Sequence, residues 1–387
     1  MQTGVTRNPH DGGSQVCRHT TVNKPVQGLR ILDCTGALPG PYATQLLADL
    51  GACVVKVERP PTGEHTRKDM PSLFEAFNRG KHSVILDLKS ENGVSDYQRL
   101  AKHADVLVEG FRPGVMDRLG IGGAQMLEAN PDLIYVSISG WGKTGVLAQT
   151  PGHDLNYLGM AGVLGDSSVG GISAPGVLMA DLASGSMAAI AILAAVIDRD
   201  RSGRGSVIDL GMADVALSWA ASANTESLFP RMNVPPVPHK GILPGHGIFA
   251  TSDGQSITLG VIEDKFWVSF KELANSSRLE SSRFDTFDDR RANSDELRKI
   301  IAGVIAERPA AYWLDNAAEL EVPVFPVLDF STAIEHPQFR NRRIVGIDDG
   351  KVALSFPAIW NGEHLSASGS APGLGENDVD KLVALWS

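Results

Sequence analysis

The stretch GLRILDCTGALPGPYATQLLADLGACVVKVERP, residues 28–60, decides the fold of this 387-residue chain. Its apolar pattern predicts a strand over 28–33, a helix over 42–50 and a second strand over 53–58. Gly51 ends the helix, because glycine readily adopts the backbone conformation that closes helices. A helix that joins two strands is typical of a right-handed crossover, so we expect the strands to pair in parallel.

The loop over 35–41 argues against a nicotinamide cofactor. It carries Gly36 and Gly40, with prolines at 39 and 41, and does not read G-x-G-x-x-G. Glu58 does stand where a ribose-binding acid could lie. Because the glycine pattern is absent, the sequence disfavours NAD.

Strands and helices continue to alternate as far as residue 210. After Trp219 the composition changes, and residues 230–247 are rich in proline and glycine, which is typical of a boundary or a long connection. The further elements that we expect before this boundary are strands at 83–88, 106–109, 133–139 and 206–210 and helices at 92–103, 115–119 and 187–199.

Beyond the boundary the pattern predicts a small α+β domain. Residues 248–261 read as a hairpin and 322–327 as an extended edge. Residues 278–307 are charged, and we expect them at the surface. Helices are expected over 265–273, 310–320 and 379–385.

These patterns predict an α/β protein. We expect a flexible N-terminal extension over 1–27, a large domain with a parallel sheet over 28–229 and a smaller α+β domain over 240–325. A C-terminal segment over 326–387 is expected to return to the large domain.

Composition excludes several classes of partner. The net charge of −10 argues against nucleic acid as a main partner, since phosphate backbones require a basic surface. No 18-residue apolar run is present, so we expect no membrane span. Cys17, Cys34 and Cys53 lack metal-binding spacing, which favours a reducing compartment and predicts no metal. We expect a cytoplasmic protein, although basic residues before residue 28 leave organellar targeting open.

His153 and Asp181 are the candidates for proton transfer. His153 follows Gly152, and Asp181 precedes the run Ser184-Gly185-Ser186; each lies at the edge of an apolar segment, and an imidazole with a carboxylate suits acid–base chemistry. Asp181 is expected near a helix N-terminus, whose dipole favours an ionised carboxylate. Taken singly, His153 also fits an ordinary loop histidine, and Asp181 an N-cap.

Cationic side chains follow several of the predicted strands. Arg59, Arg112 and Lys143 stand at strand ends, where open parallel sheets bind ligands. This placement fits a phosphate-bearing ligand held partly by backbone N–H groups, and it fits solvated surface cations equally well.

The sequence resembles the family III CoA-transferase superfamily and, within it, the α-methylacyl-CoA racemases. The resemblance runs from residue 28 to about residue 344 and rests on short blocks in the same order. After the opening stretch these blocks are NRGKHSVILDLK, ADVLVEGFRPGVMDRLGIG, GWGKTG, GHDLNY, DLASGSM, GVIEDKF and VPVFPVLDFSTAIEHPQFRNR.

The resemblance implies a Rossmann-like large domain, a small domain and a homodimer whose two subunits interlock. It also implies an acyl-CoA substrate, with no cofactor beyond CoA and no metal. The CoA contacts that it implies are Arg59, Leu86, Asp87, Leu88, Lys89, Gly110, Phe111, Arg112, Pro113, Gly114, Val115, Arg118, Gly152, Asp154 and Tyr157.

In racemases of this superfamily the residues that match His153 and Asp181 flank the substrate's α-carbon, and one that matches Glu263 supports the site. The resemblance also points to the backbone N–H of Asp154 as a donor to the enolate oxygen. Transferases of the superfamily use the aspartate as a nucleophile and lack the histidine. His153 therefore favours a racemase of 2-methylacyl-CoA thioesters.

Two other functions stay open at this point. A CoA-transferase would form an anhydride or thioester at Asp181, and a third possibility is a CoA-binding protein without activity. The sequence reads VLMA over 177–180, where the racemases carry Asn-Leu-Val-Gly, and LASG over 182–185 replaces a more glycine-rich run. Both departures bear on the choice between these functions.

Overall fold

The computed structural model describes residues 24–164, 173–223, 243–348, 351–367 and 369–387. The expected extension over 1–27 and the expected boundary over 230–247 lie largely outside the described residues. The chain forms two compact units. Unit 1 comprises the described residues of 1–157, 177–216 and 343–387, and unit 2 those of 158–176 and 217–342.

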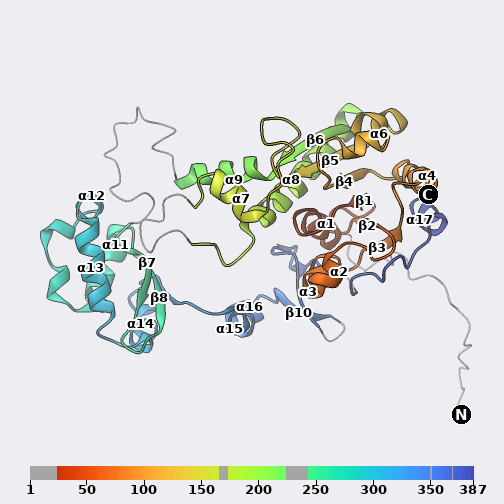
Figure 1. Cartoon of the computed structure of the whole chain (residues 1–387). Helices are drawn as coiled ribbons and strands as arrows, with labels where there is room; N and C mark the ends of the chain where they lie inside the picture. Colours follow the sequence, from red (N-terminus) through yellow and green to blue (C-terminus); the bar gives the residue numbers. More distant parts are fainter. Residues whose placement is uncertain (1–23, 165–172, 224–242, 349–350, 368) are drawn as a thin grey trace, which may run out of the picture. The chain divides into compact units, whose positions relative to one another are not determined.

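Unit 1 is built on a six-stranded parallel sheet (Figure 1). The strand order is β3-β2-β1-β4-β5-β6, which is the order of a doubly wound, Rossmann-like sheet. The expected α/β fold with parallel pairing is therefore confirmed. The strands are β1 (Arg30–Cys34), β2 (Cys53–Glu58), β3 (His82–Ile85), β4 (Val106–Glu109), β5 (Ile134–Ser139) and β6 (Ser206–Gly211).

Both faces of this sheet are covered. Ile31 and Leu32 are consecutive on β1, so they point to opposite faces, and both are fully buried. Leu32 packs in one hydrophobic cluster with Tyr97 of α4 (Glu91–Ala101) and Trp386 of α17 (Val379–Trp386). The other helices of this unit are α1 (Pro39–Asp49), α2 (Thr66–Asp69), α3 (Pro71–Phe77), α5 (Val115–Arg118), α6 (Gly123–Ala129), α7 (Asp154–Met160), α8 (Met179–Ser202) and α9 (Met212–Ala220), the last residues of α7 and α9 belonging to unit 2.

Two helices of unit 1 begin earlier than expected. Helix α1 starts at Pro39 instead of residue 42, because a proline at the first helical position loses no hydrogen bond. Helix α8 starts at Met179 instead of residue 187. Its small residues allow close packing on α1: a Cβ at Gly185 would lie 2.7 Å from the carbonyl oxygen of Pro39. The glycine there serves packing and does not break the helix.

Helix α8 also has the composition of a membrane span. Among the described helices it is the one long and apolar enough to cross a bilayer, and its most apolar window has a mean hydropathy of 1.9 and is 44% buried. Within unit 1 this helix packs against α1 and lies along β5 and β6. That packing accounts for the buried part of its apolar surface.

Unit 2 contains a three-stranded antiparallel sheet in the order β7-β8-β9. The expected hairpin is present, and the proline-containing strand lies at the edge. The elements are β7 (His246–Ala250), β8 (Ser256–Gly260), β9 (Val324–Pro326), α11 (Asp264–Ala274), α12 (Phe287–Ala292), α13 (Ser294–Ile305), α14 (Ala310–Ala317), α15 (Phe330–Glu335) and α16 (Pro337–Asn341).

The prediction that residues 278–307 lie at the surface was wrong. Leu297, Ile301 and Val304 of α13 are almost fully buried and join a core with Trp267 and Trp313. Their spacing of three and four residues is helical and amphipathic, so the many charges belong to one face only.

Of the expected C-terminal segment over 326–387, the described residues from 343 onward belong to unit 1 and lie against its sheet, whereas those before 343 belong to unit 2. The part from residue 343 onward contributes the hairpins β10 (Val345–Asp348) with β11 (Lys351–Leu354) and β12 (Ile359–Trp360) with β13 (Glu363–His364), followed by α17. The carbonyl of Trp386 accepts a hydrogen bond from Arg30 at 3.0 Å. This contact fixes the end of the chain to the first strand.

Candidate active site

The two candidate segments are joined by a carboxylate. Asp154 is the first residue of α7, directly after His153, and is 5% exposed. Its Oδ1 accepts hydrogen bonds from the backbone N–H groups of Ala180 at 2.6 Å and Asp181 at 3.1 Å. These are N–H groups of the first turn of α8, which have no intrahelical acceptor. Asp154 therefore caps α8 from another helix and holds His153 in the neighbourhood of Asp181.

This arrangement corrects the plain explanation of Asp181 as an N-cap. The N-cap position of α8 is Leu178, whose side chain makes no capping hydrogen bond. Asp181 is the third residue of the helix and lies in its first turn. Its own carboxylate is thus available for another role.

The electrostatic surroundings raise the pKa of Asp181. Burial raises the pKa of this carboxyl to about 6, and the negative charge of Asp154 acts in the same direction. A helix N-terminus alone would lower the pKa of a carboxyl. Desolvation and the neighbouring carboxylate outweigh the dipole, so Asp181 titrates in the range that suits a general acid–base group.

The backbone of His153 is fixed while the residue itself is exposed. Its N–H donates to Oδ1 of Asn156 at 2.9 Å, and its carbonyl accepts the N–H of Asn156 at 2.8 Å. Asn156 thus closes the turn that presents the imidazole. Sequence reasoning did not assign Asn156 a role of its own, although an asparagine three residues after a loop histidine is a recognisable turn signal.

Tyr157 supports the same turn. Its hydroxyl donates to the carbonyl of Gly152 at 2.6 Å, and its ring meets Trp141 edge to face at 5.0 Å between centroids. A Cβ at Gly140 would lie 2.3 Å from the tyrosine hydroxyl oxygen, and one at Gly152 would lie 2.8 Å from the ring. Burial raises the pKa of Tyr157, with a further contribution from the charge of Asp181. Tyr157 therefore lies between the histidine turn and the aspartate.

The loop after β4 lies at the switch point of the sheet, where strand order reverses between β1 and β4. Gly110 faces Thr35 of the loop after β1, and a Cβ there would meet Thr35 at 3.7 Å. The N–H of Phe111 donates to the buried Glu109 carboxylate at 2.7 Å. Gly114 has a φ of +81° and precedes α5, so the loop turns sharply and leaves Arg112 exposed. Val115 and Arg118 follow in α5.

The cations expected to contact CoA follow strands at the same edge. The Nε of Arg59, after β2, donates to the carbonyl of Gly63 at 3.1 Å. After β3, the N–H of Lys89 donates to the Asp87 side chain at 3.0 Å. Arg59, Lys89, Arg112 and Arg118 are all exposed, whereas Leu86 is buried and Leu88 half-buried. Parallel strands place these loops at one edge of the sheet.

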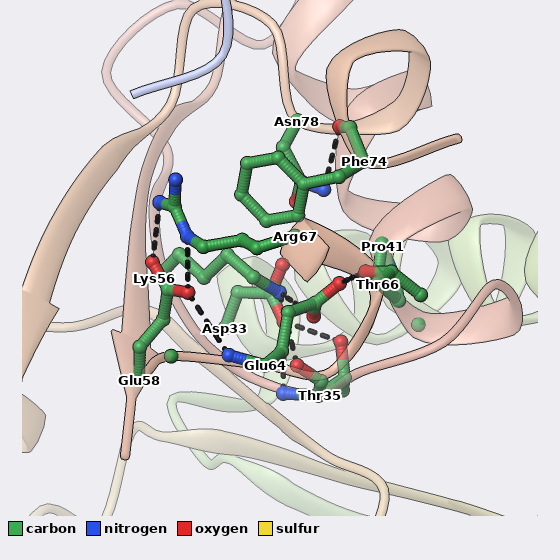
Figure 2. A network of polar contacts seen from close by, with 12 residues as sticks. Asp33, Thr35, Pro41, Lys56, Glu58, Glu64, Thr66, Arg67, Phe74 and Asn78 are labelled. Atoms are coloured by element: carbon green, nitrogen blue, oxygen red, sulfur yellow. Dashed lines mark hydrogen bonds and ion pairs between the residues drawn. The ribbon is translucent and has the colours of Figure 1, made fainter. Parts of the chain in front are cut away.

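A buried network of charged side chains underlies the Arg59 loop (Figure 2). Lys56, fully buried, binds Glu64 at 2.7 Å and the carbonyl of Thr35 at 2.9 Å. Glu58 accepts two hydrogen bonds from Arg67, each 2.7 Å long. The network thus ties the loop after β1 to the loop after β2. Sequence reasoning missed it, although charged residues inside strands that are buried on both faces are a signal.

Glu263 belongs to unit 2, where it is exposed at the N-cap position of α11. Arg290 is 3% exposed and donates to the carbonyl of Ile262 and to the carboxylate of Asp264, both at 2.8 Å. These bonds fix the residues on either side of Glu263. Its support of His153 stays a prediction.

Comparison with known proteins gives the family and the fold. A family model described as CoA-transferase family III matches residues 26–378. The chain is 33% identical over 353 residues to acetyl-CoA:oxalate CoA-transferase of Acetobacter aceti, covering 85% of this chain and 87% of that protein. It is 35% identical over 328 residues to alpha-methylacyl-CoA racemase of Homo sapiens, covering 82% and 81%. A crystal structure of a CAIB/BAIF family protein from Brucella suis superposes with a TM-score of 0.81 at 29% identity, covering 94% of this chain and 100% of that one.

Proposed function

The chain belongs to CoA-transferase family III, and on this premise we propose that it is a racemase or epimerase of 2-methylacyl-CoA thioesters. Family membership implies an enzyme with a CoA thioester substrate. The observation that carries the finer assignment is the hydrogen bond from the N–H of Asp181 to Asp154, the residue next to His153. It ties the residue next to His153 to the backbone of Asp181, which supports the proposal that the two side chains share one site.

The proposed reaction moves one proton off the α-carbon and another on. The base, His153 or Asp181 according to the enantiomer, removes the α-proton, and the electron pair of the C–H bond becomes the enolate. The second residue, in its protonated form, delivers a proton to the opposite face. A pKa of about 6 leaves Asp181 able to do either near neutral pH.

The enolate oxygen requires a hydrogen-bond donor. As the first residue of α7, Asp154 has a backbone N–H that no carbonyl of the same helix can accept. This supports the role that we propose for that N–H group. The Asp154 side chain faces the start of α8, so main chain and side chain serve different partners.

We propose that the exposed cations at the strand ends bind the phosphates of CoA. Arg59, Lys89, Arg112 and Arg118 supply exposed positive charge in the segments that follow β2, β3 and β4. The Nε of Arg59 donates to the carbonyl of Gly63, which orients the side chain and leaves the rest of its guanidinium for a ligand.

The proposed homodimer is supported by apolar side chains that each unit exposes. In unit 1, Ile190 and Ile197 of α8 are more than half exposed, and in unit 2 so are Phe325 and Phe330. Ile190 and Ile197 are seven residues apart, so they share one face of α8, and contiguous exposed apolar surface is typical of subunit contacts. Light scattering coupled to gel filtration would give twice the monomer mass, and a monomer at micromolar concentration would contradict the proposal.

A specific observation favours a second candidate, a CoA-transferase. The residues before Asp181 are Val177, Leu178, Met179 and Ala180, where the racemases have asparagine and glycine, and Val177 and Leu178 are exposed. The similarity to the oxalate CoA-transferase is close to that to the racemase. In this reaction the Asp181 carboxylate attacks the thioester carbonyl and CoA thiolate leaves, which gives an anhydride.

One experiment separates the two reactions. An enantiopure 2-methylacyl-CoA is incubated with the enzyme in D₂O, with and without a carboxylic acid acceptor. A racemase incorporates deuterium at the α-carbon without any acceptor, and His153→Ala abolishes racemisation. A transferase exchanges CoA only with an acceptor, is trapped by hydroxylamine at Asp181, and tolerates His153→Ala. Absence of deuterium with a panel of acyl groups would refute the racemase.

A further inference from the structure

We infer that the side chain of Asp154 is a positioning residue for Asp181: it holds the first turn of α8 in place, and its negative charge opposes ionisation of the neighbouring carboxyl. This inference rests on the proposed function. It goes beyond the backbone N–H of Asp154, because it assigns the carboxylate a separate task.

The geometry of the cap is unusual. A helix N-terminus is ordinarily capped by a side chain at the N-cap residue itself. Here the N-cap residue Leu178 has an apolar side chain, and the acceptor comes from Asp154, which is 27 positions from Asp181 in the sequence. Because the capping side chain belongs to α7, the position of Asp181 depends on the segment that also carries His153.

The charge of Asp154 acts on Asp181 at short range. Asp154 is buried, so little water screens its carboxylate from the carboxyl of the residue whose N–H it binds. Tyr157 of α7 is a second titratable group that interacts with Asp181. Tyr42 of α1 packs against Gly185, one turn further along α8. The negative charge of Asp154 is the one that opposes ionisation of Asp181.

The same bonds explain how the site tolerates its altered sequence. Ala180 stands where the racemases carry glycine, and it is fully buried with its N–H on Asp154 at 2.6 Å. Because the contact uses only the backbone, a methyl group at this position does not disturb it. The cap therefore preserves the start of α8 although residues 177–180 differ.

Charge and cap can be separated with three variants. Asp154→Asn keeps an oxygen acceptor and removes the charge, Asp154→Ala removes both, and Asp154→Glu keeps the charge. The control is Asp105→Asn, because Asp105 also accepts a backbone N–H, from Arg30 at 2.9 Å, and is half-buried, but it lies at the opposite edge of the sheet.

The primary readout is the titration of Asp181 in the full-length protein, followed by NMR of aspartate ¹³Cγ and assigned with Asp181→Asn. We expect Asp154→Asn to lower the titration midpoint by about one pH unit, the size of effect that a near like charge produces. Asp154→Glu is expected to stay near the wild-type midpoint, and so is Asp105→Asn. Asp154→Ala is expected to lose thermal stability in addition.

The second readout is the pH dependence of α-proton exchange. For the enantiomer that still exchanges in His153→Ala, the rate rises with pH as Asp181 ionises, and Asp154→Asn should move that limb to lower pH. The inference is overturned if Asp154→Asn leaves the Asp181 midpoint in place, or if Asp154→Glu moves it equally. The NMR titration is readable even if the wild-type enzyme exchanges no α-proton, so the two failures are distinguishable.

Discussion

Asp33→Asn tests whether the buried charge network holds unit 1 together. Asp33 is fully buried and accepts hydrogen bonds from the N–H and hydroxyl of Thr35, the hydroxyl of Thr44 at 2.7 Å and the ammonium of Lys81 at 3.1 Å. The substitution preserves volume but removes the charge. The asparagine also places an NH₂ group, which is itself a donor, against the hydrogen-bond donors that surround Asp33. Lys56 then keeps its ion pair with Glu64, whereas Lys81 loses its ion pair with Asp33.

The magnitude follows from burial. Breaking a fully buried ion pair by removing one partner costs about 3–5 kcal/mol, because the remaining charge stays desolvated. For a unit of this size each kcal/mol lowers Tm by about 2–4 °C, so the expected fall is about 6–20 °C. Asp132→Asn is the matched control, since Asp132 is exposed and surface substitutions change stability by about 0.5 kcal/mol at most.

The pH dependence gives an independent check. The neighbouring ammonium groups and the hydroxyl donors hold the pKa of Asp33 well below its usual range. A carboxyl whose folded-state pKa is depressed contributes stability above its unfolded pKa of about 3.9, and loses it as pH falls further. The Tm at equal protein concentration should therefore fall more steeply with decreasing pH below pH 4 in the wild type than in Asp33→Asn. If Asp33→Asn unfolds within about 2 °C of Asp132→Asn at pH 7, the network contributes little and the reasoning is wrong.

Three further substitutions test other parts of the structure. Gly140→Ala should abolish α-proton exchange because its Cβ would overlap Tyr157 at 2.3 Å, whereas Gly159→Ala, with open space around it, should leave exchange intact; equal rates would contradict the role of this turn. Arg290→Met should lower kcat with little change in KM. It should also lower the free energy of unfolding in urea by about 1–3 kcal/mol, because it leaves a backbone carbonyl beside Glu263 without its donor. An unchanged kcat would show that this turn does not contribute to the site. Trp386→Ala should destabilise unit 1 by about 3–5 kcal/mol, measured by thermal unfolding, because the ring is buried in the core; a shift under about 1 kcal/mol would show that α17 is dispensable.

The local pattern carried most of the information about the sheet. Strand β1, helix α1 and strand β2 are visible in the sequence because each is long, apolar and bounded by glycine or proline. Parallel pairing followed from the crossover rule, without any long-range information. The end of β3 at Ile85 was less visible, because Asp87 forms a turn with Lys89 just beyond it, in a segment that still alternates apolar residues.

The sequence pattern could not predict contacts between segments that lie far apart in the sequence. Helix α8 starts at Met179 because Asp154 provides its cap and because Gly185 packs against α1, and neither partner is near it in sequence. Ser184, Gly185 and Ser186 resemble a loop when they are read alone. The buried ion pair between Lys81 and Asp33 also joins distant segments, 48 positions apart, so charge within a strand could suggest a network but not its partners.

The state of Asp181 by itself does not decide between the two candidate reactions. With a pKa of about 6, about a tenth of the molecules carry the proton at pH 7. A raised pKa serves a carboxylate nucleophile, whose reactivity increases with basicity, as well as a general acid. A second proton carrier is required only by stereoinversion, since a proton must arrive on the face opposite to the one it left. His153, exposed beside the residue that caps the helix of Asp181, is suited to that task. Acyl transfer through Asp181 requires no imidazole at this position. For this reason the presence of His153 favours the racemase more strongly than the altered residues at 177–180 favour the transferase.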